Sequence, residues 1–125
     1  MEKLTQARRA VKSLDEILRE PFSTIVRDAA IQRFEFSSEI AWKAARQWLA
    51  VEESIEVNHP RGCYRELFRI GRIDETLSLK LLELIEDRNR TSHAYLEALA
   101  QAVFERIPNH LQTLQSLLRT LEHKS

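Results

Sequence analysis

A short polar segment, from residue 88 to residue 95, holds side chains that are suited to chemistry. It reads Arg-Asn-Arg-Thr-Ser-His-Ala-Tyr and follows a leucine-rich stretch. Arginine carries a permanent positive charge that binds anionic groups, and histidine titrates near neutral pH. On a straight helix, Arg88 with Tyr95 and Asn89 with His93 form two adjacent polar edges. The segment equally suits a helix C-terminus, where the helix dipole favours arginine and histidine, so both interpretations stay open.

A second group of arginines is spaced like one face of a helix. Arg61, Arg65 and Arg69 follow one another at intervals of four residues, and Arg72 comes next. Only Glu66, three residues before Arg69, lies within helical pairing distance. A solvated helix face explains such a stripe. The functional alternative is a contact surface for an RNA backbone or for an acidic partner.

Two long helices are expected to form the first half of the chain. Apolar residues at intervals of three and four predict a helix from about residue 4 that ends near Pro21. A second helix is predicted from about residue 23 to residue 51, a stretch without glycine or proline. Its apolar residues cover a wide arc, which indicates contact with several neighbours. One line on this arc runs through Ile25, Ala29, Phe36 and Ile40.

Three further helices are predicted in the second half. Pro60 suits the first position of a short helix, Gly71 suits its end, and Asp74 suits the cap of the next helix. A last helix is expected from about residue 96, and Pro108 should kink or split it. The predicted fold is an all-α, up-and-down four-helix bundle with an extra short helix, built as one domain over residues 1–125.

Composition excludes several other classes of protein. The 125 residues include only 2 glycines and 3 prolines, too few for the turns of a β-sandwich or barrel. No apolar run is long enough to span a bilayer, and no signal peptide is recognisable. The single cysteine, Cys63, fits a reducing cytoplasm. With 19 basic and 19 acidic residues the formal charge is zero, so nothing draws the whole chain towards nucleic acid or anionic lipid.

No metal or cofactor is expected. His59, His110 and His123 lack the spacing of metal ligands, and the chain has no glycine-rich loop to cradle a phosphate. Cys63 has no paired histidine nearby in the sequence and is interpreted as a packing residue.

The polar segment also resembles a known motif. Arg88, His93 and Tyr95 fit the pattern Arg-x4-His-x-Tyr of HEPN-domain proteins that are encoded beside a minimal nucleotidyltransferase. The resemblance extends from about residue 4 to residue 121 and is closest to the branch called nucleotidyltransferase substrate-binding proteins. The matching positions include residues 31–36, 39, 41–43, 49, 60–61, 71, 73–74, 86–89 and 91–93.

One function implied by this resemblance is metal-independent cleavage of RNA by a toxin. His93 then moves protons, Arg88 stabilises the charge on the reacting phosphate, and a homodimer brings two copies of the motif to one cleft. In this interpretation Asn89 orients His93 or a phosphate. Arg90, at a position that is usually apolar in the family, either extends an RNA-binding edge or faces water.

A second implication is a complex with a minimal nucleotidyltransferase. In such pairs the tyrosine at the position of Tyr95 accepts AMP, which silences the toxin by adding bulk and negative charge. The alternative is a non-catalytic substrate-binding subunit that completes the pocket of a two-subunit nucleotidyltransferase. The chain itself lacks the strand scaffold of a nucleotidyltransferase. We expect the toxin to be somewhat the better description.

Two polar residues on the second helix are supporting candidates. Gln32 lies in the apolar line between Ala29 and Phe36, and Glu35 is three residues further on. Buried polar groups need partners, so Gln32 and Glu35 are expected to join a structural network. The alternative for Glu35 is to support Arg88 directly.

Overall fold

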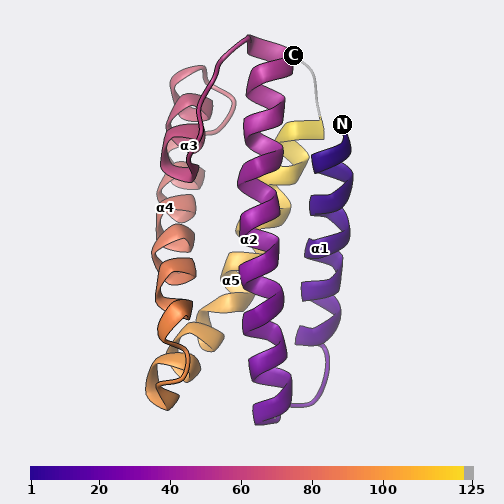
Figure 1. The fold of residues 1–125 in the computed structure, drawn as a ribbon, viewed down its shortest axis with the longest axis vertical. Helices are drawn as coiled ribbons and strands as arrows, with labels where there is room; N and C mark the ends of the chain where they lie inside the picture. Colours follow the sequence, from indigo (N-terminus) through magenta and orange to yellow (C-terminus); the bar gives the residue numbers. More distant parts are fainter. Residues whose placement is uncertain (123–125) are drawn as a thin grey trace.

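The chain folds into a bundle of helices. The computed structural model describes residues 1–122, with the elements in the order α1 (Glu2–Leu18), α2 (Thr24–Glu53), α3 (Pro60–Arg69), α4 (Glu75–Arg90), the 3₁₀-helix η1 (Thr91–His93) and α5 (Glu97–Glu122). No strand occurs within residues 1–122. Figure 1 shows the long helices side by side, with the short α3 beside α4. The predicted all-α bundle with an extra short helix is confirmed.

Local side-chain bonds begin α2 and α4 where the sequence predicts. The Ser23 hydroxyl accepts a hydrogen bond from the Val26 N–H at 3.0 Å, and the Asp74 carboxylate accepts one from the Leu77 N–H at 2.8 Å. Each bond satisfies a backbone donor that the first turn of a helix leaves without a partner. Both caps depend only on neighbours in sequence.

The short helix α3 is also bounded as predicted. Pro60 occupies its first position, where the missing N–H costs nothing, and the ring Nδ1 of His59 accepts a hydrogen bond from the Gly62 N–H at 3.0 Å. After the helix, Gly71 adopts a left-handed conformation with φ of 81°. Glycine takes this conformation without the steric cost that a side chain brings.

The last helix remains a single element. Pro108 lies inside α5, which runs without interruption from Glu97 to Glu122, so of the expected kink or split, the split does not occur. Pro108 itself is exposed, whereas Ile107 and Leu111 on either side are buried. Packing of both halves against the bundle therefore stabilises the helix despite the hydrogen bond that proline removes.

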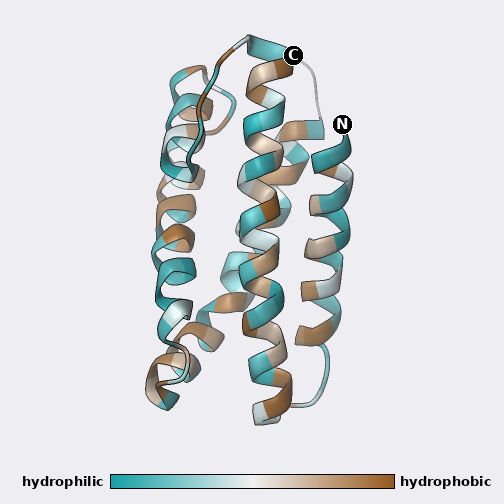
Figure 2. Cartoon of the chain, viewed as in Figure 1, coloured by the Kyte–Doolittle hydropathy of each residue, from teal (hydrophilic) through white to brown (hydrophobic). Residues whose placement is uncertain are grey.

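The second helix is the centre of the bundle. As predicted, α2 contacts several neighbours, namely α1, α3, α4 and α5. In Figure 2, hydrophobic and hydrophilic residues alternate along each long helix, as expected for helices with one buried face. The largest fully buried apolar side chains are Tyr64, Phe34, Leu14, Leu49, Leu67, Leu81, Leu84, Ile107, Leu114, Leu117 and Val103.

Part of the apolar surface of α2 faces outwards. Ile25 and Phe36 are 81% and 62% exposed, whereas Ile40, on the same predicted line, is buried. The helix therefore presents these two large apolar side chains to solvent in its first half. No helix among residues 1–122 has the combination of length and apolar character needed to cross a membrane.

Candidate functional site

The polar segment spans the end of α4 and the connection to α5. Helix α4 ends at Arg90, one 3₁₀ turn follows, and α5 begins at Glu97. The helix-end interpretation of this segment is thus confirmed. The straight-helix pairing of Arg88 with Tyr95 and of Asn89 with His93 is wrong, because the chain leaves the α4 axis before His93 is reached.

Arg88 is held against α2. Its Nη1 donates to Glu35 Oε2 at 3.4 Å and to Thr91 Oγ1 at 3.2 Å, and its Nε lies 3.3 Å from Glu39 Oε1. Thr91 Oγ1 also donates to Glu35 Oε2 at 3.0 Å. The alternative in which Glu35 contacts Arg88 is therefore the one found. Two carboxylates from one helix fix the guanidinium in place.

His93 and Tyr95 form a separate, exposed pair. Tyr95 Oη lies 3.5 Å from His93 Nδ1, and the two rings meet edge to face with centroids 6.0 Å apart. Tyr95 is 79% exposed and His93 is also exposed. Both the imidazole and the phenol hydroxyl can be reached from solvent. The segment thus presents a fixed cation on α4 and two reactive side chains on the connection.

Arg90 is engaged by carboxylates of its own helix. Its Nη1 lies 2.7 Å from Asp87 Oδ1, and its Nη2 lies 3.7 Å from Glu86 Oε2. The Arg90 side chain is 47% exposed, so it faces water while it forms ion pairs with Asp87 and Glu86. Asn89 is exposed, and within residues 1–122 its side chain makes no hydrogen bond to His93.

A buried carboxylate next to Arg88 was missed by the sequence reasoning. Asp87 has a side chain only 2% exposed, and it accepts hydrogen bonds from Arg106 at 2.7 and 2.8 Å. His110 Nε2 lies 2.7 Å from the same carboxylate. Burial opposes ionisation, but the hydrogen bonds from Arg106, His110 and Arg90 outweigh it and hold the pKa of Asp87 well below its usual range.

A signal for this network does exist in the sequence. Asp87 follows Leu84 by three residues, and His110 follows Ile107 by three, so both fall on the buried side of their helices. The His110 ring also stacks on Phe34, with centroids 5.2 Å apart. A carboxylate and an imidazole in core positions of two helices indicate a buried hydrogen-bonded pair.

A small cavity lies next to Arg88, between α2, α3 and α4. It has a volume of about 40 Å³, and Ser38, Tyr64 and Arg88 are among the residues that line it. The Ser38 and Tyr64 hydroxyls are buried and have no hydrogen-bond partner within the described part of the chain. Burial raises the pKa of Tyr64.

The arginine stripe lies on the exposed face of α3. Arg61, Arg65 and Arg69 are all exposed, and Arg69 makes two hydrogen bonds to Glu66 at 3.0 and 2.9 Å. Arg61 and Arg65 form no ion pair within residues 1–122. Arg72 leaves the stripe, because its guanidinium lies over the Trp48 ring.

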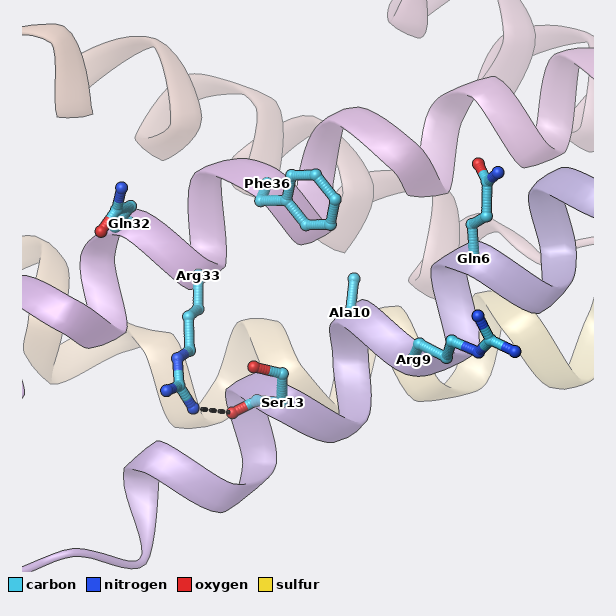
Figure 3. A pocket seen from close by; sticks show the side chains of 7 residues that line it. All are labelled: Gln6, Arg9, Ala10, Ser13, Gln32, Arg33 and Phe36. Carbon is cyan, nitrogen blue, oxygen red and sulfur yellow. Dashed lines mark hydrogen bonds between the residues drawn. The ribbon is translucent and has the colours of Figure 1, made fainter.

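Gln32 does not join a buried network, contrary to expectation. It is exposed and lines a groove of about 480 Å³ between α1 and α2, together with Phe36 (Figure 3). Ile31 and Phe34 face the core, so Gln32 and Phe36 fall on the outer side of the helix. In the same groove Arg33 donates a hydrogen bond to the Ser13 carbonyl at 2.8 Å.

Comparison with known proteins identifies the family. The family model described as nucleotidyltransferase substrate binding protein like matches residues 2–123. This chain belongs to that family. The model of the nucleotidyltransferase substrate-binding family matches the whole bundle of this chain, including the connection between α4 and α5.

Solved structures of similar proteins agree with this assignment. A protein from Thermus thermophilus is 35% identical, with a TM-score of 0.88 over 94% of this chain and 99% of that one. HI0074 from Haemophilus influenzae, described as a substrate-binding domain of a nucleotidyltransferase, is 26% identical, with a TM-score of 0.79 over 96% and 99% of the two chains.

A HEPN toxin has the same fold. A tri-AMPylated toxin from Shewanella oneidensis, in complex with an MNT antitoxin, is 16% identical, with a TM-score of 0.79 over 98% of this chain and 96% of that one. At that identity the likeness concerns the fold alone. A search of curated proteins finds no match.

In this family member, His59, His110 and Cys63 contribute to capping or packing of the bundle. His59 caps α3, and His110 belongs to the Asp87 network, while His123 lies outside the described residues. Cys63 is fully buried, which agrees with a packing role, and burial raises the pKa of its thiol to about 11. Residues 1–122 contain no group of three or more His, Cys, Asp or Glu side chains that could hold a metal ion.

Proposed function

We propose that this chain is the HEPN component of a two-gene module with a minimal nucleotidyltransferase. It acts in the cytoplasm as a metal-independent endoribonuclease toxin and is silenced by AMP transfer to Tyr95. The observation that carries the proposal is the arrangement of residues 88–95. A fixed guanidinium at the end of α4 is followed by an exposed imidazole and an exposed phenol, from Arg88, His93 and Tyr95.

Arg88 is suited to bind the reacting phosphate. Its Nη1 and Nε contact α2 and Thr91, while its Nη2 makes no hydrogen bond within residues 1–122. The Arg88 side chain is 28% exposed, and we assign this nitrogen to a phosphate oxygen. Since arginine stays charged at any working pH, it can stabilise the negative charge that develops on the phosphorane.

His93 is suited to move protons during cleavage. The 2′-oxygen of the RNA loses its proton and attacks the adjacent phosphorus, and the bond to the 5′-oxygen breaks as that oxygen gains a proton. A single histidine cannot be base and acid at once, so two copies of His93 share these steps in a homodimer. Two apolar side chains on α2, Ile25 and Phe36, are exposed and supply surface for self-association.

Tyr95 is suited to accept AMP from the nucleotidyltransferase. Its Oη attacks the α-phosphorus of ATP, a new O–P bond forms, and the bond to pyrophosphate breaks. The phenol proton passes to a base, and His93 Nδ1 lies 3.5 Å from the oxygen. The attached phosphate then adds negative charge and bulk beside His93, which blocks RNA from the site.

The arginine stripe supports the same function in a secondary role. Arg61 and Arg65 are exposed and unpaired within the described residues, so we assign them to contact with the RNA backbone or with the partner. Arg69 and Arg90 already pair with carboxylates and contribute less. Asn89, exposed between Arg88 and His93, adds a further hydrogen-bonding group to the site.

The cleavage test compares wild type with His93→Ala, each expressed without the partner. Ser92→Ala is the matched control, because Ser92 is exposed in the same segment and bonds only to the Asn89 carbonyl. We expect wild type and Ser92→Ala to arrest growth and to cut cellular RNA in chelating buffer, and His93→Ala to do neither. Equal growth and intact RNA in all three cultures exclude the toxin.

The modification test measures intact mass after incubation with ATP and the partner. The chain has 2 tyrosines, and Tyr64 is buried, so Tyr64→Phe is a natural control for Tyr95→Phe. We expect wild type and Tyr64→Phe to gain AMP-sized mass and Tyr95→Phe to gain none. An AMP-sized gain in Tyr95→Phe excludes Tyr95 as the sole acceptor.

The second candidate function is a non-catalytic substrate-binding subunit. It is favoured by the 26% identity to HI0074, whose structure is described as a substrate-binding domain of a nucleotidyltransferase. In that case the chain forms a stable complex with the nucleotidyltransferase, and the affinity of the complex for its substrate drops when the chain is left out. His93→Ala then leaves both growth and RNA unchanged.

A further inference from the structure

The connection that carries His93 and Tyr95 has few side-chain contacts with the bundle after Thr91, whose Oγ1 donates to Glu35 Oε2 at 3.0 Å. Residues 91–96 contain only one 3₁₀ turn, and Ser92, His93, Tyr95 and Leu96 are exposed. Thr91 is the one buried residue of the connection. The positions of the reactive side chains therefore depend on how the two ends of the connection are held.

The first end is held by Asp87. This carboxylate, on the last turn of α4, accepts hydrogen bonds from Arg106 on α5 at 2.7 and 2.8 Å and lies 2.7 Å from His110 Nε2. Asp87 and His110 are both buried, with side chains 2% and 6% exposed. The end of α4 is thus tied to the middle of α5.

The second end is held by Arg27 of α2. Its side chain is 5% exposed, and its Nη1 and Nη2 bind the two oxygens of Glu97, the first residue of α5. Gln101, one turn later, lies 3.4 Å from Nη1, and Asp28 accepts from Nε at 3.1 Å. The start of α5 is thus tied to α2, immediately after Leu96.

We infer that Asp87 and Arg27 are positioning residues that fix the two ends of residues 91–96 and so hold His93 and Tyr95 in one geometry. An effect of these residues on AMP transfer rests on the proposed function. Their effect on the position of residues 91–96 follows from the contacts alone. Asp87 and Arg27 touch neither His93 nor Tyr95, so they act through the backbone. We name them the Asp87 anchor and the Arg27 anchor.

Stability alone does not explain two anchors at these places. Burying the Asp87 carboxylate and the Arg27 guanidinium carries a desolvation cost, although their partners Arg106 and Glu97 stay partly exposed, and apolar residues of similar size often stabilise a fold as well. Directional hydrogen bonds instead select one arrangement of the groups that they join. Both anchors flank the same short connection, and the bidentate arginine contacts fix orientation as well as distance.

The test begins with Glu97→Gln, which weakens the Arg27 anchor at an exposed position. The Glu97 side chain is 75% exposed, so the variant is expected to fold. Glu83→Gln is the matched control, since Glu83 is exposed on α4 and belongs to neither anchor. Asp87→Asn tests the other anchor in the same assays.

Amide hydrogen exchange provides the first measurement. In Glu97→Gln and Asp87→Asn we expect exchange of residues 91–96 to rise about fivefold or more relative to wild type, while α1 changes by less than about twofold in Glu97→Gln. Glu83→Gln should match wild type throughout. Unchanged exchange in the connection, or an equal rise in α1 of Glu97→Gln, overturns the inference.

The kinetics of AMP transfer provide the second measurement. A misplaced acceptor lowers kcat more than it raises KM, so we expect kcat for Glu97→Gln to fall about three- to tenfold with KM within about twofold. A normal kcat despite faster exchange overturns the positioning role. If wild type accepts no AMP, the proposed function fails, while the exchange data still decide whether the anchors hold the connection.

Discussion

Removal of the Asp87 charge should lower the free energy of unfolding, because one carboxylate joins the end of α4 to α5. Asp87→Asn keeps the size of the side chain but leaves Arg106 and His110 facing a neutral amide. Breaking a buried pair from one side costs about 3 to 5 kcal/mol. Because the Arg106 side chain is 46% exposed and can be rehydrated, we expect a loss of about 2 to 3 kcal/mol at pH 7.

The pH dependence of this loss follows from the direction of the pKa shift. Asp87 has a lower pKa in the folded protein than in the unfolded chain, where an aspartate titrates near pH ~4. Its stabilisation is therefore fully present above about pH 4 and declines as the pH falls towards the folded-state pKa. The difference between wild type and Asp87→Asn should therefore be smaller at about pH 3 than at pH 7.

Urea denaturation of both proteins at each pH measures these free energies. Asp15→Asn is the matched control, because Asp15 pairs with Arg19 on the surface at 3.1 Å and should contribute less than about 1 kcal/mol. If Asp87→Asn costs no more than Asp15→Asn at pH 7, the buried network does not stabilise the junction. A difference that grows at low pH contradicts the assigned direction of the pKa shift.

Three further predictions concern other parts of the surface and core. Arg65→Ala combined with Arg69→Ala should weaken RNA binding at low salt and flatten its salt dependence, and an unchanged slope rules out the stripe as an RNA contact. Phe36→Asp should reduce self-association in sedimentation while changing stability by less than about 1 kcal/mol; unchanged association excludes this face. Tyr64→Phe should keep or raise stability by up to about 1 kcal/mol in thermal unfolding, because its buried hydroxyl has no partner within the described residues; a clear loss contradicts this account.

Helix boundaries could be predicted because local groups set them. The caps at Ser23 and Asp74, the proline at the first position of α3 and the left-handed Gly71 all act within four residues of their own position. No knowledge of the neighbouring helices is needed to infer them. The same locality explains why the all-α bundle could be predicted from the sequence.

The burial of individual side chains could not be predicted as reliably as the helix boundaries. Periodicity identifies apolar lines on α2, but it does not say which line a neighbouring helix covers, so it places Gln32 and Phe36 inside, whereas both lie outside. Asp87 shows the reverse case, in which partners 19 and 23 residues away make the burial of a carboxylate possible.

The residues of the candidate site can be proposed from the sequence, but their geometry could not be predicted from it. Spacing and a family resemblance identify Arg88, His93 and Tyr95, and the contact of Glu35 with Arg88 is one of two alternatives that the sequence allows. The contact between His93 and Tyr95 is not expected from the sequence, because it requires α4 to end at Arg90. That ending depends on where α5 packs, which the local sequence does not specify.

The division of the site between helix and connection has an evolutionary consequence. Arg88 is fixed by carboxylates within the bundle, whereas His93 and Tyr95 lie on an exposed stretch where substitutions typically change stability by less than about 0.5 kcal/mol. Descendants of one ancestor can thus lose or regain the reactive side chains without refolding the scaffold. Both candidate functions proposed above are therefore compatible with one and the same scaffold.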